Sequence, residues 1–208
     1  MDNVPNSAFY IRDFISKEEE RELLDKPLNQ DGLQNWGGKP TERGMLFEPL
    51  PSWLTSPFSK FSQLGIFEAC SKFKLPNHCL INEYESGQGI MPHEDGPFYY
   101  PTVATISMKS HTILNFYKHR VIEDSDVEQN EHNTIPNFSL LIEPRSLLVL
   151  QDALYTTYLH GIEERNSDNL HEKNLMNLSN DIDKDVILER VTRVSLTYRV
   201  KKLLLRLK

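Results

Sequence analysis

The sequence predicts an α+β protein that is mainly β, a double-sheet jelly roll with supporting N-terminal helices. Helical patterns occur only before Gly65. From residue 76 onward, short apolar segments alternate with turn residues such as Gly87 and Pro144. Helices that precede a run of short strands are typical of a helical layer packed on two sheets. We expect one domain over residues 1–208, because this length is sufficient to bury a core.

The first part of the chain, residues 1–75, is expected to contain the supporting helices. It predicts, in order, a strand, a helix, a strand and a helix at residues 9–11, 16–26, 33–36 and 51–64. Ser16 and Glu19 form a capping box that begins the first helix. Pro57 lies inside the second helix, so a kink or a break is expected there.

The next part, residues 76–200, is expected to form the jelly-roll core. Its strands are predicted at residues 79–84, 103–108, 112–117, 138–142, 146–150 and 192–200. Polar, charged segments near 120–137 and 163–190 interrupt the pattern, and we expect surface insertions that are mobile or partly disordered. Leu175 and Leu178 are expected to anchor the second insertion weakly. A basic tail, residues 201–208, follows the last strand.

Charge and cysteine content limit the possible partners and compartments. The formal net charge of −7 argues against non-specific binding of nucleic acid by the whole surface, but leaves a local basic groove open. Cys70 and Cys79 have no metal-site spacing and are expected to be reduced, buried thiols. The N-terminus lacks a signal peptide, and no apolar run reaches the ~20 residues of a membrane span. We therefore expect an intracellular monomer without a membrane anchor, in the cytoplasm, the nucleus or both.

Three residues predict a metal site. In an extended segment, side chains at i and i+2 point the same way, so His93 and Asp95 could grip one ion. His160, after a strongly apolar predicted strand, could supply the third ligand. Two histidines and one carboxylate on one face of Fe(II) are characteristic of non-haem iron oxygenases. The other histidines have no ligand pattern and are expected to be surface or hydrogen-bonded residues: His78, His111, His119, His132 and His171.

The last predicted strand alternates polar and apolar residues. Its polar face carries Arg193, Ser195, Thr197 and Arg199. In a simple sandwich this face would meet solvent; alternatively, it lines an internal cavity that binds a 2-oxo diacid. Asn82 and Tyr84 share a face of another strand and favour the second interpretation. Arginine can bind a carboxylate bidentately, and we expect Arg193 to hold the far carboxylate while Arg199 lies nearer the metal.

These motifs resemble the AlkB family of Fe(II)/2-oxoglutarate-dependent dioxygenases over nearly the whole chain. The family pattern is present as Asn82-x-Tyr84, His93-x-Asp95, His160 and Arg193-x5-Arg199. Longer strings are similar to one subgroup, AlkB homologue 6: residues 33–38, 89–97, 143–150 and 192–197. The sequence departs from the family at Ser195, where the bacterial prototype has Asn. It also departs at residues 25–33, a short segment in which Gly32 replaces a basic residue of the subgroup. Two interpretations of this segment therefore stay open: it forms a substrate lid, or it is too short to do so.

The resemblance implies a double-stranded β-helix (a jelly roll) with N-terminal recognition loops. It implies Fe(II), 2-oxoglutarate and O₂ as reactants, with succinate and CO₂ as products. The implied metal ligands are His93, Asp95 and His160. The implied 2-oxoglutarate residues are Asn82, Tyr84, Arg193, Ser195, Thr197 and Arg199.

Relatives in this family oxidise N-methyl groups of nucleic-acid bases, and some act on protein. The chain is therefore expected to demethylate a base, with release of formaldehyde. Such a base must be single-stranded or flipped to reach the metal, and it could stack on the aromatic residues Trp36, Phe98, Tyr99 and Tyr100. Ordinary loop packing is the alternative for these aromatics. Two other functions stay open: an oxygenase of protein or of a small molecule, and a non-catalytic nucleic-acid-binding or adaptor protein with a vestigial site.

Overall fold

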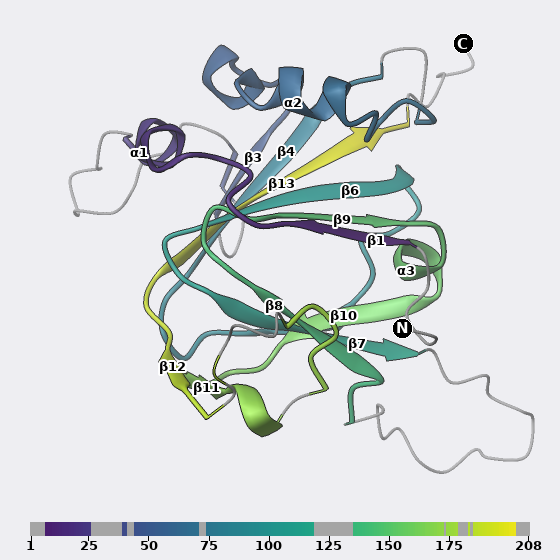
Figure 1. Ribbon diagram of the computed structural model, residues 1–208. Helices are drawn as coiled ribbons and strands as arrows, with labels where there is room; N and C mark the ends of the chain where they lie inside the picture. The colour runs from purple at the N-terminus through teal and green to yellow at the C-terminus, as the bar shows by residue number, and fades with distance from the viewer. Residues whose placement is uncertain are drawn as a thin grey trace, which may run out of the picture.

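Two antiparallel sheets face each other across the interior of the protein (Figure 1). The structure is a computed structural model that describes residues 7–25, 39–40, 44–70, 74–118, 135–172, 174–178, 183 and 185–202. Few and short helices accompany the sheets. The predicted mainly β jelly roll is therefore confirmed.

The larger sheet has the strand order β1-β9-β6-β13-β4-β3-β2. The strands are Ala8–Ile11 (β1), Leu147–Gln151 (β9), Tyr99–Met108 (β6), Arg193–Lys201 (β13), His78–Tyr84 (β4), Gly44–Phe47 (β3) and Lys39–Pro40 (β2). All neighbouring pairs are antiparallel. Strand β13 lies near the middle of the sheet, where Leu196 pairs with Ile81 on one side and Ile106 on the other.

The smaller sheet has the strand order β5-β10-β7-β8. The strands are Ile90–His93 (β5), Tyr158–Ile162 (β10), Thr112–Lys118 (β7) and Phe138–Ile142 (β8). Between the sheets, Phe116 and Phe138 stack with ring centroids 4.7 Å apart and pack with Leu148 and Leu150 of the larger sheet. The short helix α3, Asp152–Thr156, joins this cluster through Leu154. This apolar cluster forms one wall of the cavity described below, since Ile142, Leu148 and Leu150 also line it.

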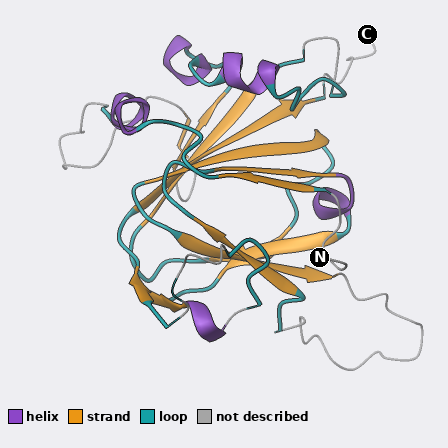
Figure 2. Ribbon diagram, viewed as in Figure 1, coloured by secondary structure: helices purple, strands orange, loops and turns teal. Residues whose placement is uncertain are grey.

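Helices cover the outer face of the larger sheet, as Figure 2 shows. They are Lys17–Leu24 (α1), Ser52–Thr55 (η1) and Phe58–Gln63 (α2). The capping box at the start of α1 is confirmed, because Ser16 Oγ accepts from Glu19 N while Glu19 Oε2 accepts from Ser16 N. The predicted break at Pro57 is also confirmed, since η1 ends and α2 begins around it. None of the helices in the described part of the chain has the length and apolarity that crossing a membrane requires.

The helical layer explains which face of β13 is buried in the apolar core. Val194, Leu196 and Tyr198 point toward the helices, and each is fully buried. The Tyr198 ring lies 5.2 Å from the Phe61 ring, and its hydroxyl donates to the Leu54 carbonyl at 3.0 Å. The alternate residues of β13 therefore point into the space between the sheets.

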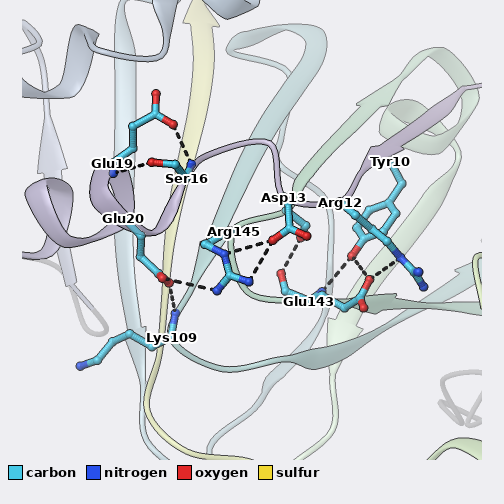
Figure 3. A network of polar contacts seen from close by, with 10 residues as sticks. Tyr10, Arg12, Asp13, Ser16, Glu19, Glu20, Lys109, Glu143 and Arg145 are labelled. Atoms are coloured by element: carbon cyan, nitrogen blue, oxygen red, sulfur yellow. Dashed lines mark hydrogen bonds and ion pairs between the residues drawn. The ribbon is translucent and has the colours of Figure 1, made fainter. Parts of the chain in front are cut away.

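A network of polar contacts fixes the N-terminal strand and helix to the turn between β8 and β9 (Figure 3). Arg145 donates twice to Asp13 Oδ1, at 3.1 and 2.9 Å, and lies 3.6 Å from Glu20. The Tyr10 hydroxyl donates to Glu143 Oε2 at 3.0 Å and accepts from Glu143 N at 2.9 Å. The exposed pairs contribute little stability each, but together they set where α1 meets the sheet.

The predicted insertion at residues 163–190 is more ordered than expected. It forms Ser167–Asn169 (β11), Leu170–Glu172 (η2) and Ile187–Glu189 (β12) outside the smaller sheet. Leu170 packs on Ile113 and Leu141, and Leu175, Leu178 and Leu188 pack against this cluster. The expectation of a mobile segment is therefore wrong for its described residues. Residues 119–134 of the other predicted insertion, and the predicted strand at 33–36, lie outside the described part of the chain.

A buried ion pair holds this insertion. Asp168 is completely buried and accepts from Arg190 Nε at 2.6 Å, from Arg190 Nη2 at 2.7 Å and from His111 Nε2 at 3.1 Å. Burial by itself would raise the pKa of Asp168, but the hydrogen bonds from His111 and Arg190 outweigh it and lower the pKa to about 2. The carboxylate consequently stays ionised in the folded protein well below its ordinary range.

Replacement of Asp168 by Asn is expected to lower the free energy of unfolding by about 3–5 kcal/mol at neutral pH, because Arg190 would stay buried without a counter-charge. The folded-state pKa lies below the ordinary value of 3.8, so the wild-type protein keeps this contribution above pH 3.8 and loses it as the pH falls toward about 2. The variant should lack that part of the acid dependence in urea unfolding. Asp185→Asn, at an exposed carboxylate, is the matched control; equal loss in both variants would contradict the prediction.

Candidate active site

A cavity of about 520 Å³ lies between the two sheets. Its lining includes the predicted metal and 2-oxoglutarate residues: Asn82, Tyr84, His93, Asp95, His160, Arg193, Ser195, Thr197 and Arg199. Arg193, Ser195 and Arg199 are 7%, 3% and 6% exposed. The alternative in which the polar face of β13 meets solvent is thus wrong, and that face forms a cavity wall.

The two histidines come from neighbouring strands of the smaller sheet. His93 ends β5 and pairs directly with His160 of β10. Their ring centroids are 4.5 Å apart. The strands can approach this closely because residue 161 is glycine: a Cβ there would lie 2.9 Å from Pro92 N and 3.0 Å from the Ile90 carbonyl oxygen. Gly161 therefore sets the distance between the two imidazoles.

The hydrogen bonding of His93 decides which ring nitrogen is available. His93 Nδ1 lies 2.9 Å from the Met91 carbonyl oxygen. Because a carbonyl oxygen only accepts, Nδ1 carries a proton, so in the neutral tautomer the lone pair lies on Nε2. For His160, burial and the nearby charges of His93 and Arg199 lower the pKa to about 4, against the opposing effect of Asp95. His160 is thus neutral, the form that binds metals, and the His93 ring is oriented by the Met91 carbonyl.

Asp95 follows β5 in the loop at the same end of the cavity. It accepts a hydrogen bond from Arg199 Nη1 at 2.6 Å, and both side chains are nearly buried. The loop is held by the Tyr155 hydroxyl of α3, which donates to the Gly96 carbonyl at 2.9 Å. Within the described residues, no three His, Cys, Asp or Glu side chains converge into a ready-made metal cluster. The structure brings the two imidazoles together and directs the carboxylate to Arg199.

Arg199 is part of a stack that lies behind Asp95. The guanidinium carbon of Arg199 is 4.5 Å from the centroid of the Tyr99 ring. The Tyr99 hydroxyl lies 3.1 Å from Nε2 of His78, which is 1% exposed. Burial and the positive charge of Arg199 lower the pKa of His78 to about 4. The neutral His78 imidazole, the Tyr99 ring and the Arg199 guanidinium therefore form a chain of contacts that ends at the Asp95 carboxylate.

Arg193 lies at the other end of the polar wall of β13. Its Nη2 donates to Ser107 Oγ at 2.7 Å, and its guanidinium carbon is 5.6 Å from the Tyr84 ring centroid. Burial lowers the pKa of Arg193 to about 10, so the side chain stays charged. Its Nε has no hydrogen-bond partner, and the ion pairs among the described residues do not include Arg193. A buried cation without a counter-charge is costly, so this end of the cavity favours an anionic ligand.

The aromatic residues predicted to contact substrate are separated by the fold. Tyr99 lines the cavity, and Phe98 is 61% exposed in the loop before β6. Tyr100 points to the other side of β6 and packs against the core under the helices, so it is not a wall of the cavity. Trp36 lies outside the described residues.

Three residues that shape the site are missing from the sequence prediction. Tyr155 holds the loop after Asp95, Gly161 sets the spacing of the histidines, and His78 contacts Tyr99. A glycine directly after a candidate ligand, His160-Gly161, is a signal that could have indicated close strand packing. The roles of Tyr155 and His78 depend on contacts 59 and 21 residues away in the sequence, which no local pattern reveals.

Comparison with known proteins identifies the class. Residues 33–199 match the 2OG-Fe(II) oxygenase superfamily. The chain is 46% identical to "Probable RNA/DNA demethylase ALKBH6" of Danio rerio over 94% of this chain and 86% of that protein. Among solved structures, OsALKBH1 aligns with a TM-score of 0.55 at 11% identity, covering 95% of this chain and 100% of that chain. A prolyl-4-hydroxylase of Pseudomonas putida aligns with a TM-score of 0.50 at 12% identity, covering 94% and 93%.

The two structural matches show the shared fold, and the sequence matches show the family. The chain belongs to the 2OG-Fe(II) oxygenase superfamily and, within it, to the AlkB family. It is a 2-oxoglutarate-dependent dioxygenase that uses Fe(II), 2-oxoglutarate and O₂, as the resemblance implied.

Replacement of Gly161 by Ala is expected to reduce oxygenase turnover by roughly 100-fold, because the new Cβ would meet backbone atoms of β5 and separate the histidines. Succinate formation from 2-oxoglutarate measures the effect. Gly96→Ala is no suitable control, because Gly96 has a φ of +85°. Ala153→Gly in α3 is the control instead, because it lowers local stability near the site without changing the contact between β5 and β10. Wild-type turnover in Gly161→Ala would contradict the prediction that the spacing of these strands determines activity.

Proposed function

We propose that this oxygenase removes N-methyl groups from nucleic-acid bases. The observation that supports this proposal is the 46% identity to a relative named as a probable RNA/DNA demethylase, over 94% of this chain and 86% of that protein. One atom of O₂ would enter the N-methyl C–H bond, and the other would enter succinate as 2-oxoglutarate loses CO₂. The N-hydroxymethyl product then loses formaldehyde and leaves an N–H on the base.

We assign Fe(II) to His93, Asp95 and His160. The donor set fits the ion, since two imidazole nitrogens and one carboxylate are the ligands that non-haem Fe(II) takes on one face. The protonated Nδ1 of His93 leaves Nε2 for the metal, and the Met91 carbonyl orients the ring. When bound, the iron supplies the oxidising chemistry by activating O₂ with 2-oxoglutarate. The protein's contribution is to hold these three side chains and to orient the Asp95 carboxylate through its hydrogen bond from Arg199.

We assign the far carboxylate of 2-oxoglutarate to Arg193. The absence of any anionic partner for this buried guanidinium among the described residues supports the assignment. Asn82, Tyr84, Ser195 and Thr197 line the wall between the two arginines and would bind the rest of the cosubstrate. Arg199 is committed to Asp95, so its role is to orient the carboxylate at the metal end.

A nucleic-acid base must leave its stack to enter a cavity between two sheets. Tyr99, in the cavity wall, and the exposed Phe98 beside it supply aromatic surface at the metal end. Trp36 stays a candidate from the sequence. A single-stranded or flipped base is therefore the proposed substrate. The two free, buried thiols of Cys70 and Cys79 favour a reducing compartment, and we propose a monomer that acts in the cytoplasm, the nucleus or both.

Replacement of Asp95 by Asn is expected to weaken Mn(II) binding by more than roughly 100-fold, because the amide lacks the negative charge of the ligand. Asn keeps an oxygen that can accept from Arg199, so the domain should still fold, but the buried guanidinium loses its counter-charge and the thermal midpoint should fall. Isothermal titration with Mn(II) in place of Fe(II) measures the affinity. Glu94→Gln removes a neighbouring charge and is the matched control; a loss in the control equal to that in Asp95→Asn would contradict the ligand assignment.

The substrate class is tested with N-methylated single-stranded oligonucleotides, identical unmethylated oligonucleotides and N-methylated peptides. We expect formaldehyde in a one-to-one ratio with succinate from the methylated oligonucleotides alone. Formaldehyde from the peptides alone would favour a protein oxygenase. Wild-type succinate formation no higher than that of Asp95→Asn, with every substrate, would instead favour the non-catalytic alternative.

A further inference from the structure

Thr112 is a buried polar residue in the cavity wall, and it is not among the residues assigned above to the metal or to 2-oxoglutarate. It begins β7 in the smaller sheet, opposite the polar face of β13. The side chain is 2% exposed, and its Oγ1 has no hydrogen-bond partner among the described residues. Thr112 and Leu114 both line the cavity, whereas Ile113 between them packs outside the sheet. The side chain of Thr112 is therefore directed between the sheets.

Thr112 lies at the same end of the cavity as Arg193. Both residues line the main cavity, and both also line a void of about 10 Å³ that continues from it, together with Tyr84 and Ile162. Two of the residues around this void thus carry a buried side-chain atom without a hydrogen-bond partner, Thr112 Oγ1 and Arg193 Nε. Buried polar groups are almost always hydrogen-bonded, and here the two orphan atoms come from opposite sheets at one place.

A single carboxylate at this end of the cavity would offer acceptors to both residues. A carboxylate has two oxygens with about four acceptor sites. A guanidinium fills at most two of them in a bidentate pair, so an additional hydroxyl donor is accommodated without competition. Oγ1 of threonine can donate, and its β-branched side chain has few rotamers, so the donor is held in place before the ligand arrives.

We propose that Thr112 donates a hydrogen bond to the far carboxylate of 2-oxoglutarate, and that with Arg193 it selects 2-oxo diacids over 2-oxo acids without that carboxylate. The inference rests on the proposed assignment of Arg193. Pyruvate would leave both Thr112 Oγ1 and Arg193 Nε unsatisfied in a buried site, which penalises its binding. Thr112 is thus a cosubstrate-binding and specificity residue that the motif pattern does not include.

The test compares Thr112→Val, which keeps the shape and removes the hydroxyl, with Thr112→Ser, which keeps the hydroxyl. Affinities of the Mn(II)-loaded full chain for 2-oxoglutarate and for pyruvate are measured by isothermal titration. We expect Thr112→Val to weaken 2-oxoglutarate roughly 10- to 100-fold, the usual effect of one hydrogen bond to a charged group. Thr112→Ser should stay within about threefold of wild type, and pyruvate should bind equally to all three proteins.

Unchanged 2-oxoglutarate affinity in Thr112→Val would overturn the inference and would leave the hydroxyl to a bound water in the small void. An equal loss for 2-oxoglutarate and pyruvate would also overturn it, because the change would then act on the metal or the fold. Thr112→Ala repeats the measurement if valine crowds the strand. Failure of the wild-type Mn(II) protein to bind 2-oxoglutarate at all would instead refute the proposed cosubstrate site, and the Thr112 assignment with it.

Discussion

The structure depends on one constraint: strand β13 carries an apolar face and a charged face, and both are buried. The apolar face is satisfied by the helices, where Tyr198 packs on Phe61. The charged face is nearly buried, so each arginine is stabilised by a partner inside the protein or in a ligand. Arg199 pairs with Asp95, whereas Arg193 contacts the Ser107 hydroxyl and the Tyr84 ring and has no carboxylate partner among the described residues. The cavity therefore has one end where the arginine is paired with a protein carboxylate, at Arg199, and another end that favours an anionic ligand, at Arg193.

The same strand also sets the length of the cavity. Arg199 lies six positions after Arg193, which corresponds to about 20 Å between their Cα atoms along an extended strand. The side chains reach inward from these two points, and the paired strands β4 and β6 hold the register over the whole span. The metal end is then completed from the other sheet by His93 and His160, whose spacing depends on Gly161. Ligand position is thus determined by two rigid sheets, while the loop after Asp95 is tied to α3 through Tyr155.

Regular alternation made part of this predictable from the sequence. The strand at residues 138–142 was predicted with its observed bounds, and β4, β7 and β13 were each predicted to within one residue at either end. Strands β5 and β10 were not predicted, because Pro92 and Gly161 weaken a strand pattern, although Gly161 is required where the two strands meet closely. The buried pair of Asp168 and Arg190 was also missed. Charged residues usually indicate solvent, and nothing local shows that these two meet in the interior.

The central claim is that the polar wall of β13 orients 2-oxoglutarate with its far carboxylate at Arg193 and its 2-oxo acid group toward His93, Asp95 and His160. A crystal structure with Mn(II) and 2-oxoglutarate tests it most directly. The account predicts the metal on those three side chains, Asp95 still bonded to Arg199, and the far carboxylate on Arg193. A far carboxylate bound by Arg199, or a metal held without one of the three side chains, would contradict it.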